Sequence, residues 1–100
     1  MGTPVALNAL NGSATDSSPW LNADATVIYF ASERSGGSGG RDIWVARRST
    51  SSGSFGAPRP LGSINTAGDE DDPWLSPDLK TIYFVRNVSG AGSEIYVATR

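Results

Sequence analysis

The sequence of 100 residues contains no cysteine and no histidine. Without cysteine there is no disulfide, no thiol nucleophile and no thiolate metal site. Without histidine there is no Ser-His-Asp or Cys-His nucleophile system and no imidazole zinc site. Any catalysis would therefore depend on carboxylates, lysine, tyrosine or a bound cofactor, and we expect a protein that is not an enzyme.

The chain also lacks long apolar runs and clusters of basic residues. Because no run of 18 apolar residues is present, we expect no insertion into a membrane. The start of the chain has neither a basic region nor an apolar core, so no signal peptide is visible. The net charge of −2 and the pI near 4.8 argue against nucleic acid as a partner.

One motif occurs twice in the chain. The pattern Pro-Trp-Leu-x-x-Asp-x-x-x-Ile-Tyr-Phe begins at Pro19 and again at Pro73, 54 positions later. The two copies extend to residues 4–11 and 58–65 at the same spacing, and to residues 42–46 and 94–98 at a spacing of 52. The sequence therefore predicts an internal duplication within a domain of residues 1–100, with units at residues 4–47 and 58–99.

Each unit is expected to form four short antiparallel strands. The expected strands are residues 4–10, 19–21, 26–32 and 43–47 in the first unit, and residues 58–64, 73–76, 81–86 and 95–99 in the second. Asn-Ala-Asp and Ser-Pro-Asp turns separate the second strand from the third, and a Ser/Gly-rich loop covers residues 35–40. No segment keeps a helical apolar period beyond two turns, so the fold class is all-β.

The run Val27-Ile28-Tyr29-Phe30 is apolar on both faces of its strand. Such a strand needs packing partners above and below its sheet. A lone four-stranded sheet cannot provide them, whereas sheets stacked radially as the blades of a β-propeller can. A two-layer sandwich is the rival architecture, but its strands should alternate apolar and polar residues, and these strands alternate only weakly.

The second copy of the motif, followed by residues 94–98, resembles the WD-like repeat of TolB-type β-propellers. The resemblance implies a blade with the Pro-Trp strand innermost and the Pro-x-x-Leu strand outermost. It also implies protein partners and a location in a bacterial periplasm or cell envelope. Ala25 and Leu79 stand where the family usually has glycine, so these turns are expected to form without a positive φ.

Two blades cannot close a ring, because known propellers need about 4 to 8. The chain begins with a sequence typical of an outermost strand and ends with a third strand, so residues 4–10 match the strand that the last blade lacks. We therefore expect a homotrimer with six blades, or a homotetramer with eight as the second choice. The expected function is that of a non-catalytic scaffold or binding module, a natural or engineered two-blade fragment whose partner is itself.

An acidic segment precedes the second Pro-Trp pair and is expected to lie on a loop at the mouth of the central channel. Its residues are Asp69, Glu70, Asp71 and Asp72, and the first copy contributes Asp16. Carboxylates at this mouth could bind Ca²⁺, which gives the alternative function of a cation- or ligand-binding, or hydrolase-associated, propeller. The spacing matches no calcium-loop motif, so a solvated acidic turn is favoured and no metal or cofactor is assigned.

Two further sets of residues are interpreted as structural. The aromatic residues that could form binding platforms are expected in the core between blades; they are Trp20, Trp44, Trp74 and Tyr96. The arginines expected on the solvated rim are Arg41, Arg47, Arg48, Arg59 and Arg86.

Overall fold

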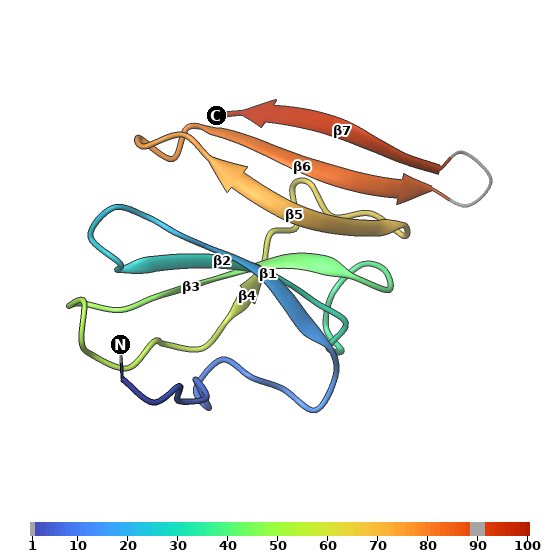
Figure 1. Ribbon diagram of the computed structural model, residues 1–100. Helices are drawn as coiled ribbons and strands as arrows, with labels where there is room; N and C mark the ends of the chain where they lie inside the picture. The colour runs from blue at the N-terminus through green and yellow to red at the C-terminus, as the bar shows by residue number, and fades with distance from the viewer. Residues whose placement is uncertain (1, 89–91) are drawn as a thin grey trace.

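The computed structural model describes residues 2–88 and 92–100. These residues form seven strands in two antiparallel sheets and contain no helix. The first sheet has the order β1-β2-β3-β4, and the second has the order β5-β6-β7. Figure 1 shows the two sheets stacked one above the other, with the N-terminus and the C-terminus on opposite sides of the stack. The all-β prediction is confirmed.

Each sheet is built from strands that follow one another in the chain. The strands are β1 (Asp16–Leu21), β2 (Val27–Ser32), β3 (Asp42–Arg47), β4 (Arg59–Pro60), β5 (Asp69–Leu75), β6 (Thr81–Val88) and β7 (Gly92–Thr99). Within each sheet, strands that are consecutive in the chain pair with one another, as in a meander.

The main apolar core lies between the two sheets. It contains Val27, Tyr29 and Ile43 from the first sheet, and Leu75, Ile82 and Phe84 from the second. All six positions of β2 are buried, as its apolar run predicts. The residues of β2 that face away from the second sheet need a cover of their own. A second core cluster provides it, in which Leu10 and Phe55 pack on Ile28, Phe30, Trp44 and Ala46.

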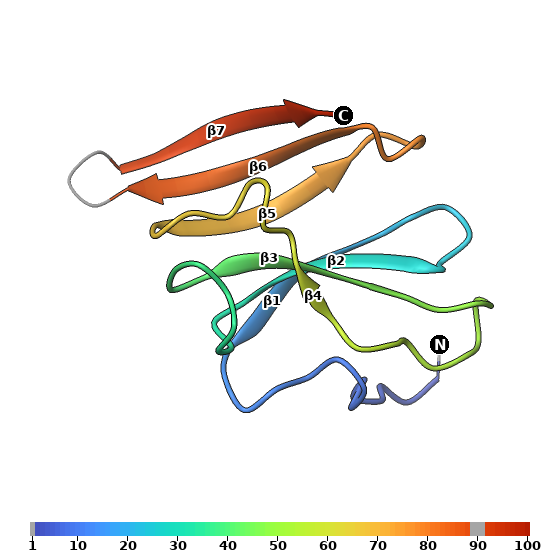
Figure 2. The same cartoon turned by 180° about the vertical axis from the view of Figure 1, so that it is seen from behind.

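The segment at residues 4–10 is not a strand, which corrects the sequence prediction. It runs without regular structure and ends in a turn, on the side of the first sheet that faces away from the second (Figures 1 and 2). Its counterpart at residues 58–64 forms only the short β4, which pairs with β3. A strand needs a sheet edge to pair with, and the edge of β7 lies on the far side of the stack from residues 4–10 (Figure 1). The second sheet therefore has three described strands instead of four.

The first strand of each sheet carries a bulge at the same place. The register slips between Ser17 and Trp20 in β1, and between Asp71 and Trp74 in β5. Ser18 and Asp72 take up the extra residue with φ of 53° and 50°. Proline follows each of them and needs no ladder partner there, because β1 and β5 are edge strands.

The turns after β1 and β5 do contain a positive φ, contrary to expectation. Ala25 and Leu79 both have a φ of 61°. Side chains stabilise the turn around Ala25, because the Asn22 side-chain oxygen accepts hydrogen bonds from the Thr26 and Val27 N–H groups at 2.9 Å. The backbone thus keeps the conformation that glycine would favour, although a side chain costs about 1 kcal/mol there.

Candidate interaction surface

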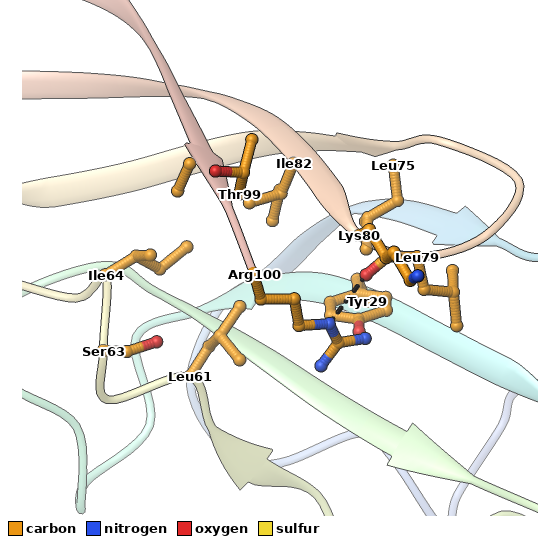
Figure 3. Close-up of a pocket in the computed structure, with 11 residues that line it drawn as sticks. Tyr29, Leu61, Ser63, Ile64, Leu75, Leu79, Lys80, Ile82, Thr99 and Arg100 are labelled. Atoms are coloured by element: carbon orange, nitrogen blue, oxygen red, sulfur yellow. Dashed lines mark hydrogen bonds between the residues drawn. The ribbon is translucent and has the colours of Figure 1, made fainter.

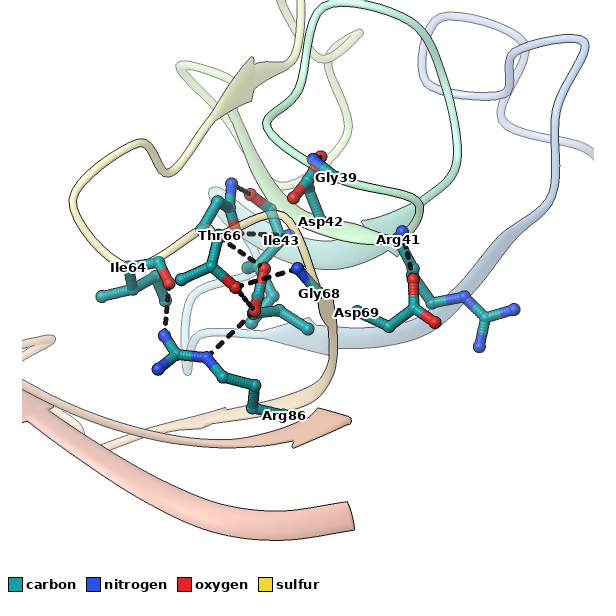
Figure 4. A network of polar contacts seen from close by, with 11 residues as sticks. Gly39, Arg41, Asp42, Ile43, Ile64, Thr66, Gly68, Asp69 and Arg86 are labelled. Carbon is teal, nitrogen blue, oxygen red and sulfur yellow. Dashed lines mark hydrogen bonds and ion pairs between the residues drawn. The ribbon is translucent and has the colours of Figure 1, made fainter. Parts of the chain in front are cut away.

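Arg86 anchors the second sheet to the loop that precedes it. Its Nε donates to Glu70 at 3.0 Å, and one of its terminal nitrogens donates to the Ile64 carbonyl at 2.7 Å (Figure 4). Glu70 is fully buried and also accepts bonds from the N–H and hydroxyl of Thr66. The guanidinium lies over the rings of Phe84 and Tyr96 at 5.4 and 4.5 Å. This arginine is therefore structural and not a solvated rim residue.

Arg34 makes the same set of contacts in the first sheet. It forms an ion pair with Asp16 at 2.9 Å and donates to the Leu10 carbonyl. Its guanidinium lies over Phe30 and Trp44 at 5.2 and 5.4 Å. Sequence reasoning missed this residue, because the two arginines are 52 positions apart whereas their partners Leu10 and Ile64 are 54 apart. The change in spacing could have given the signal, because it is 54 residues at Phe30 and Phe84 but already 52 at the two arginines.

The acidic segment is part of strand β5 and not a loop, which corrects the sequence prediction. Its carboxylates bind different donor groups, two of which belong to Arg41. Asp69 accepts from the Arg41 N–H at 2.8 Å, Asp71 pairs with the Arg41 guanidinium at 2.8 Å, Glu70 pairs with Arg86, and Asp72 accepts from the Ser18 hydroxyl at 2.9 Å. Asp16 is held by Arg34 and Ser32. Within residues 2–88 and 92–100, no three carboxylates gather into a group that could bind a metal ion.

Two of these carboxylates have lowered pKa values. For Asp16, burial alone would raise the pKa, but hydrogen bonds from Ser32 and Arg34 outweigh it and bring the pKa below its usual value. The same competition holds at Asp71, where burial opposes the hydrogen bonds from neighbouring donors, including Arg41, and the net pKa is lowered. Both carboxylates are therefore charged under ordinary conditions and belong to ion pairs that stabilise the fold.

Asn65 fastens the segment after β4 to β3. Its side-chain oxygen accepts from the Ile43 N–H at 3.0 Å, and its side-chain nitrogen donates to the Ile43 carbonyl at 3.0 Å. The N–H of Leu61 donates to the same carbonyl at 2.9 Å. Asn65 and Ile43 are both buried. Two side-chain bonds to one backbone unit define a specific attachment point for this segment.

The face of the second sheet that points away from the first is apolar and exposed. It carries Trp74, Tyr83, Ile95 and Val97. Their counterparts in the first sheet are Trp20, Tyr29, Ile43 and Val45, which lie in the core between the sheets. Tyr83 is 45% exposed where Tyr29 is 2% exposed, and Ile95 is 79% exposed where Ile43 is fully buried. The outer face of the second sheet thus repeats one half of an interface that exists inside the chain.

The outer face of the first sheet repeats the other half. Leu75, on the inner face of the second sheet, is 3% exposed, whereas its counterpart Leu21 is 43% exposed. A pocket of about 280 Å³ lies on this outer face between Leu7, Leu10 and Phe30. The corresponding pocket between the two sheets measures about 80 Å³ and is lined by Tyr29 and Leu61 (Figure 3). The outer pocket lacks a residue in the place of Tyr29.

Of the aromatic residues expected in the core, three pack in or against the core clusters and one is exposed on the outer face of the second sheet. Trp44 is buried, and Trp20 and Tyr96 pack against the core between the sheets. Trp74 is instead 52% exposed and contacts Tyr83 with ring centroids 5.8 Å apart. For Trp74 the interpretation as core is wrong for the single chain, because no sheet covers that face.

Of the other arginines expected on the rim, two have specific partners. Arg41 pairs with Glu33 and Asp71, and Arg48 lies over the ring of Phe55 at 4.1 Å. Arg47 and Arg59 are exposed, as expected.

These features define the class of the protein: an all-β chain of two stacked antiparallel sheets, in which Arg34 and Arg86 make equivalent contacts and the first strand of each sheet has the same bulge. Comparisons with protein-family models, curated proteins and solved structures find no match to this chain. Among the described residues, no helix is long and apolar enough to cross a membrane.

Proposed function

We propose that the protein is a non-catalytic scaffold whose chains assemble head to tail into a closed β-propeller, with two blades from each chain. One observation carries the proposal: the interface between the two sheets occurs once inside the chain, and the half of it that carries Tyr29 and Ile43 is repeated, exposed, by Tyr83 and Ile95 on the outer face of the second sheet. The other half is repeated on the outer face of the first sheet, where Leu21 is exposed and Leu10 and Phe55 cover the remaining positions. A head-to-tail contact between copies would bury Tyr83 and Ile95 of one chain under the first sheet of the next. It would repeat contacts that the chain already makes.

This contact is heterologous, so copies would add to one another until the rotation closes a ring. Six blades from three chains agree with the number in TolB-type propellers, whose repeat the sequence resembles. Eight blades from four chains are the second choice. In either ring the bulged strands β1 and β5 would line the channel, where Ser18 and Asp72 would alternate. Protein partners at the mouth of this channel are the binding role that the resemblance implies.

Mass in solution tests the proposal. Light scattering should give three or four times the chain mass of 10.4 kDa, with three as the expected value. The assembly should dissociate on dilution into chains that keep their β-sheet circular dichroism signal. A folded protein that is monodisperse at 10.4 kDa across a wide concentration series would refute the assembly.

A further inference from the structure

The residues that form the contact between Asn65 and Ile43 have counterparts elsewhere in the chain, and within the described residues these counterparts do not contact each other. Asn11 and Leu7 are the counterparts of Asn65 and Leu61, and Ile95 is the counterpart of Ile43. Asn11, Leu7 and Ile95 are all exposed. Ile95 lies on β7, which forms an edge of the second sheet in the described structure. The chain thus contains a second asparagine side chain and a second backbone unit at a sheet edge, and together they could form the same two hydrogen bonds.

The segment that carries Asn11 is already shaped for this contact. The N–H groups of Leu10 and Asn11 both donate to the Leu7 carbonyl, at 2.9 and 3.0 Å. The N–H groups of Ile64 and Asn65 donate to the Leu61 carbonyl in the same way, both at 3.1 Å. The turn that presents Asn65 to Ile43 is therefore formed at Asn11 before any partner is present, so little ordering is required on binding.

The contact cannot be made within one chain. Leu10 is buried against the first sheet, and Arg34 binds its carbonyl. The N-terminal segment therefore lies on the side of the first sheet that faces away from the second, while β7 lies at the opposite end of the stack (Figure 2). The nearest available β7 edge belongs to another copy that stacks its second sheet under this first sheet.

We propose that Asn11 of one chain binds the backbone N–H and carbonyl of Ile95 in the next copy, and that the residues before it extend that copy's second sheet. The inference rests on the proposed head-to-tail assembly. The register follows from β4, where Pro60 is opposite Trp44 and Arg59 is opposite Val45. Ala6 is then opposite Tyr96 of the next copy, and Val5 is opposite its Val97. The Asn11 side chain determines this register, because its two bonds fit only one backbone unit.

The first test compares Asn11→Leu with Asn8→Leu, an exposed asparagine in the same turn. Loss of two hydrogen bonds should weaken each contact between copies about tenfold. Three contacts close a trimer from three chains, so the midpoint concentration should rise by roughly 30-fold in Asn11→Leu. Asn8→Leu should leave the midpoint unchanged. Light scattering of serial dilutions measures both values, and circular dichroism shows that each variant is folded.

The second test uses the absence of native cysteine. Val5→Cys combined with Val97→Cys should form disulfides on mild oxidation, because directly opposite residues of antiparallel strands have Cα atoms within disulfide range. Non-reducing gels should show linked dimers and trimers of the chain. Val5→Cys combined with Thr99→Cys shifts one partner by two residues and should link much more slowly.

The results separate this inference from the proposed function. An assembly of the expected mass that is insensitive to Asn11→Leu, or that forms no Val5–Val97 link, would overturn the attachment through Asn11 and leave the ring intact. A monomeric wild-type chain would refute both. A higher midpoint for Asn11→Leu alone, together with the linked trimer, would establish the attachment and its register.

Discussion

The exposed isoleucine of β7 offers the sharpest perturbation of the proposed assembly. Ile95 is 79% exposed in the single chain, whereas its counterpart Ile43 is fully buried. Complete burial of such a side chain is worth about 1.5–3 kcal/mol, so burial of the exposed part of Ile95 would contribute roughly 1–2 kcal/mol at each contact between copies. Ile95→Asp would remove this contribution and would force a carboxylate out of water, at a further cost of at least about 1 kcal/mol.

The two effects together come to roughly 3 kcal/mol for each contact, a factor of more than 100 in affinity. Three such contacts close a trimer, so the midpoint concentration should rise about 1000-fold and the ring should be absent at ordinary working concentrations. The single chain should stay folded, because surface substitutions usually change stability by only about 0.5 kcal/mol.

Light scattering across a concentration series is the assay, with circular dichroism as the measure of folding. Ser38→Asp introduces the same charge in the exposed Ser/Gly-rich loop, away from both apolar faces, and should assemble like the wild type. If Ile95→Asp assembles to the wild-type mass with an unchanged midpoint, the outer face of the second sheet is not an interface, and the proposed stacking is wrong.

Three other predictions concern the polar contacts. Glu70→Ala should lower the free energy of unfolding in urea by about 3–5 kcal/mol, because it leaves the guanidinium of Arg86 without its buried partner; an unchanged value would mean that the pair adds nothing. Stability should be constant above the ordinary pKa of an aspartate, near 4, and should fall as the pH drops through the lowered pKa values of Asp16 and Asp71. Asp16→Asn should make the decrease in stability at low pH smaller. Melting temperatures of the variant and the wild type, measured across the acid range, test this. Ca²⁺ should leave the melting temperature unchanged, because the acidic side chains are already bound to different donor groups of the protein; a rise would instead favour the cation-binding alternative.

Much of the local structure follows from the sequence alone. The apolar runs of β2 and β6, the turns after each Pro-Trp-Leu and the 54-residue spacing are patterns of side-chain type, and they predict strands, turns and equivalent positions directly. The all-β class depends only on such patterns. The polar networks are harder to predict from the sequence, because Arg34 and Arg86 bind equivalent partners from positions that do not align in the two copies. Their roles depend on where the side chains end, and the spacing of the backbone does not show this.

Tertiary packing decided which equivalent residues are buried. Tyr29 and Tyr83 have the same neighbours in sequence, yet one lies between two sheets and the other faces outward, because only the first has another sheet stacked on it. Residues 4–10 likewise match the segment around β4 but do not form a strand, because a strand needs an unpaired edge beside it, and in one chain that edge lies on the far side of the stack. The sequence determines which secondary structure a segment prefers, whereas its burial and strand pairing depend on which sheets pack against it in the folded chain.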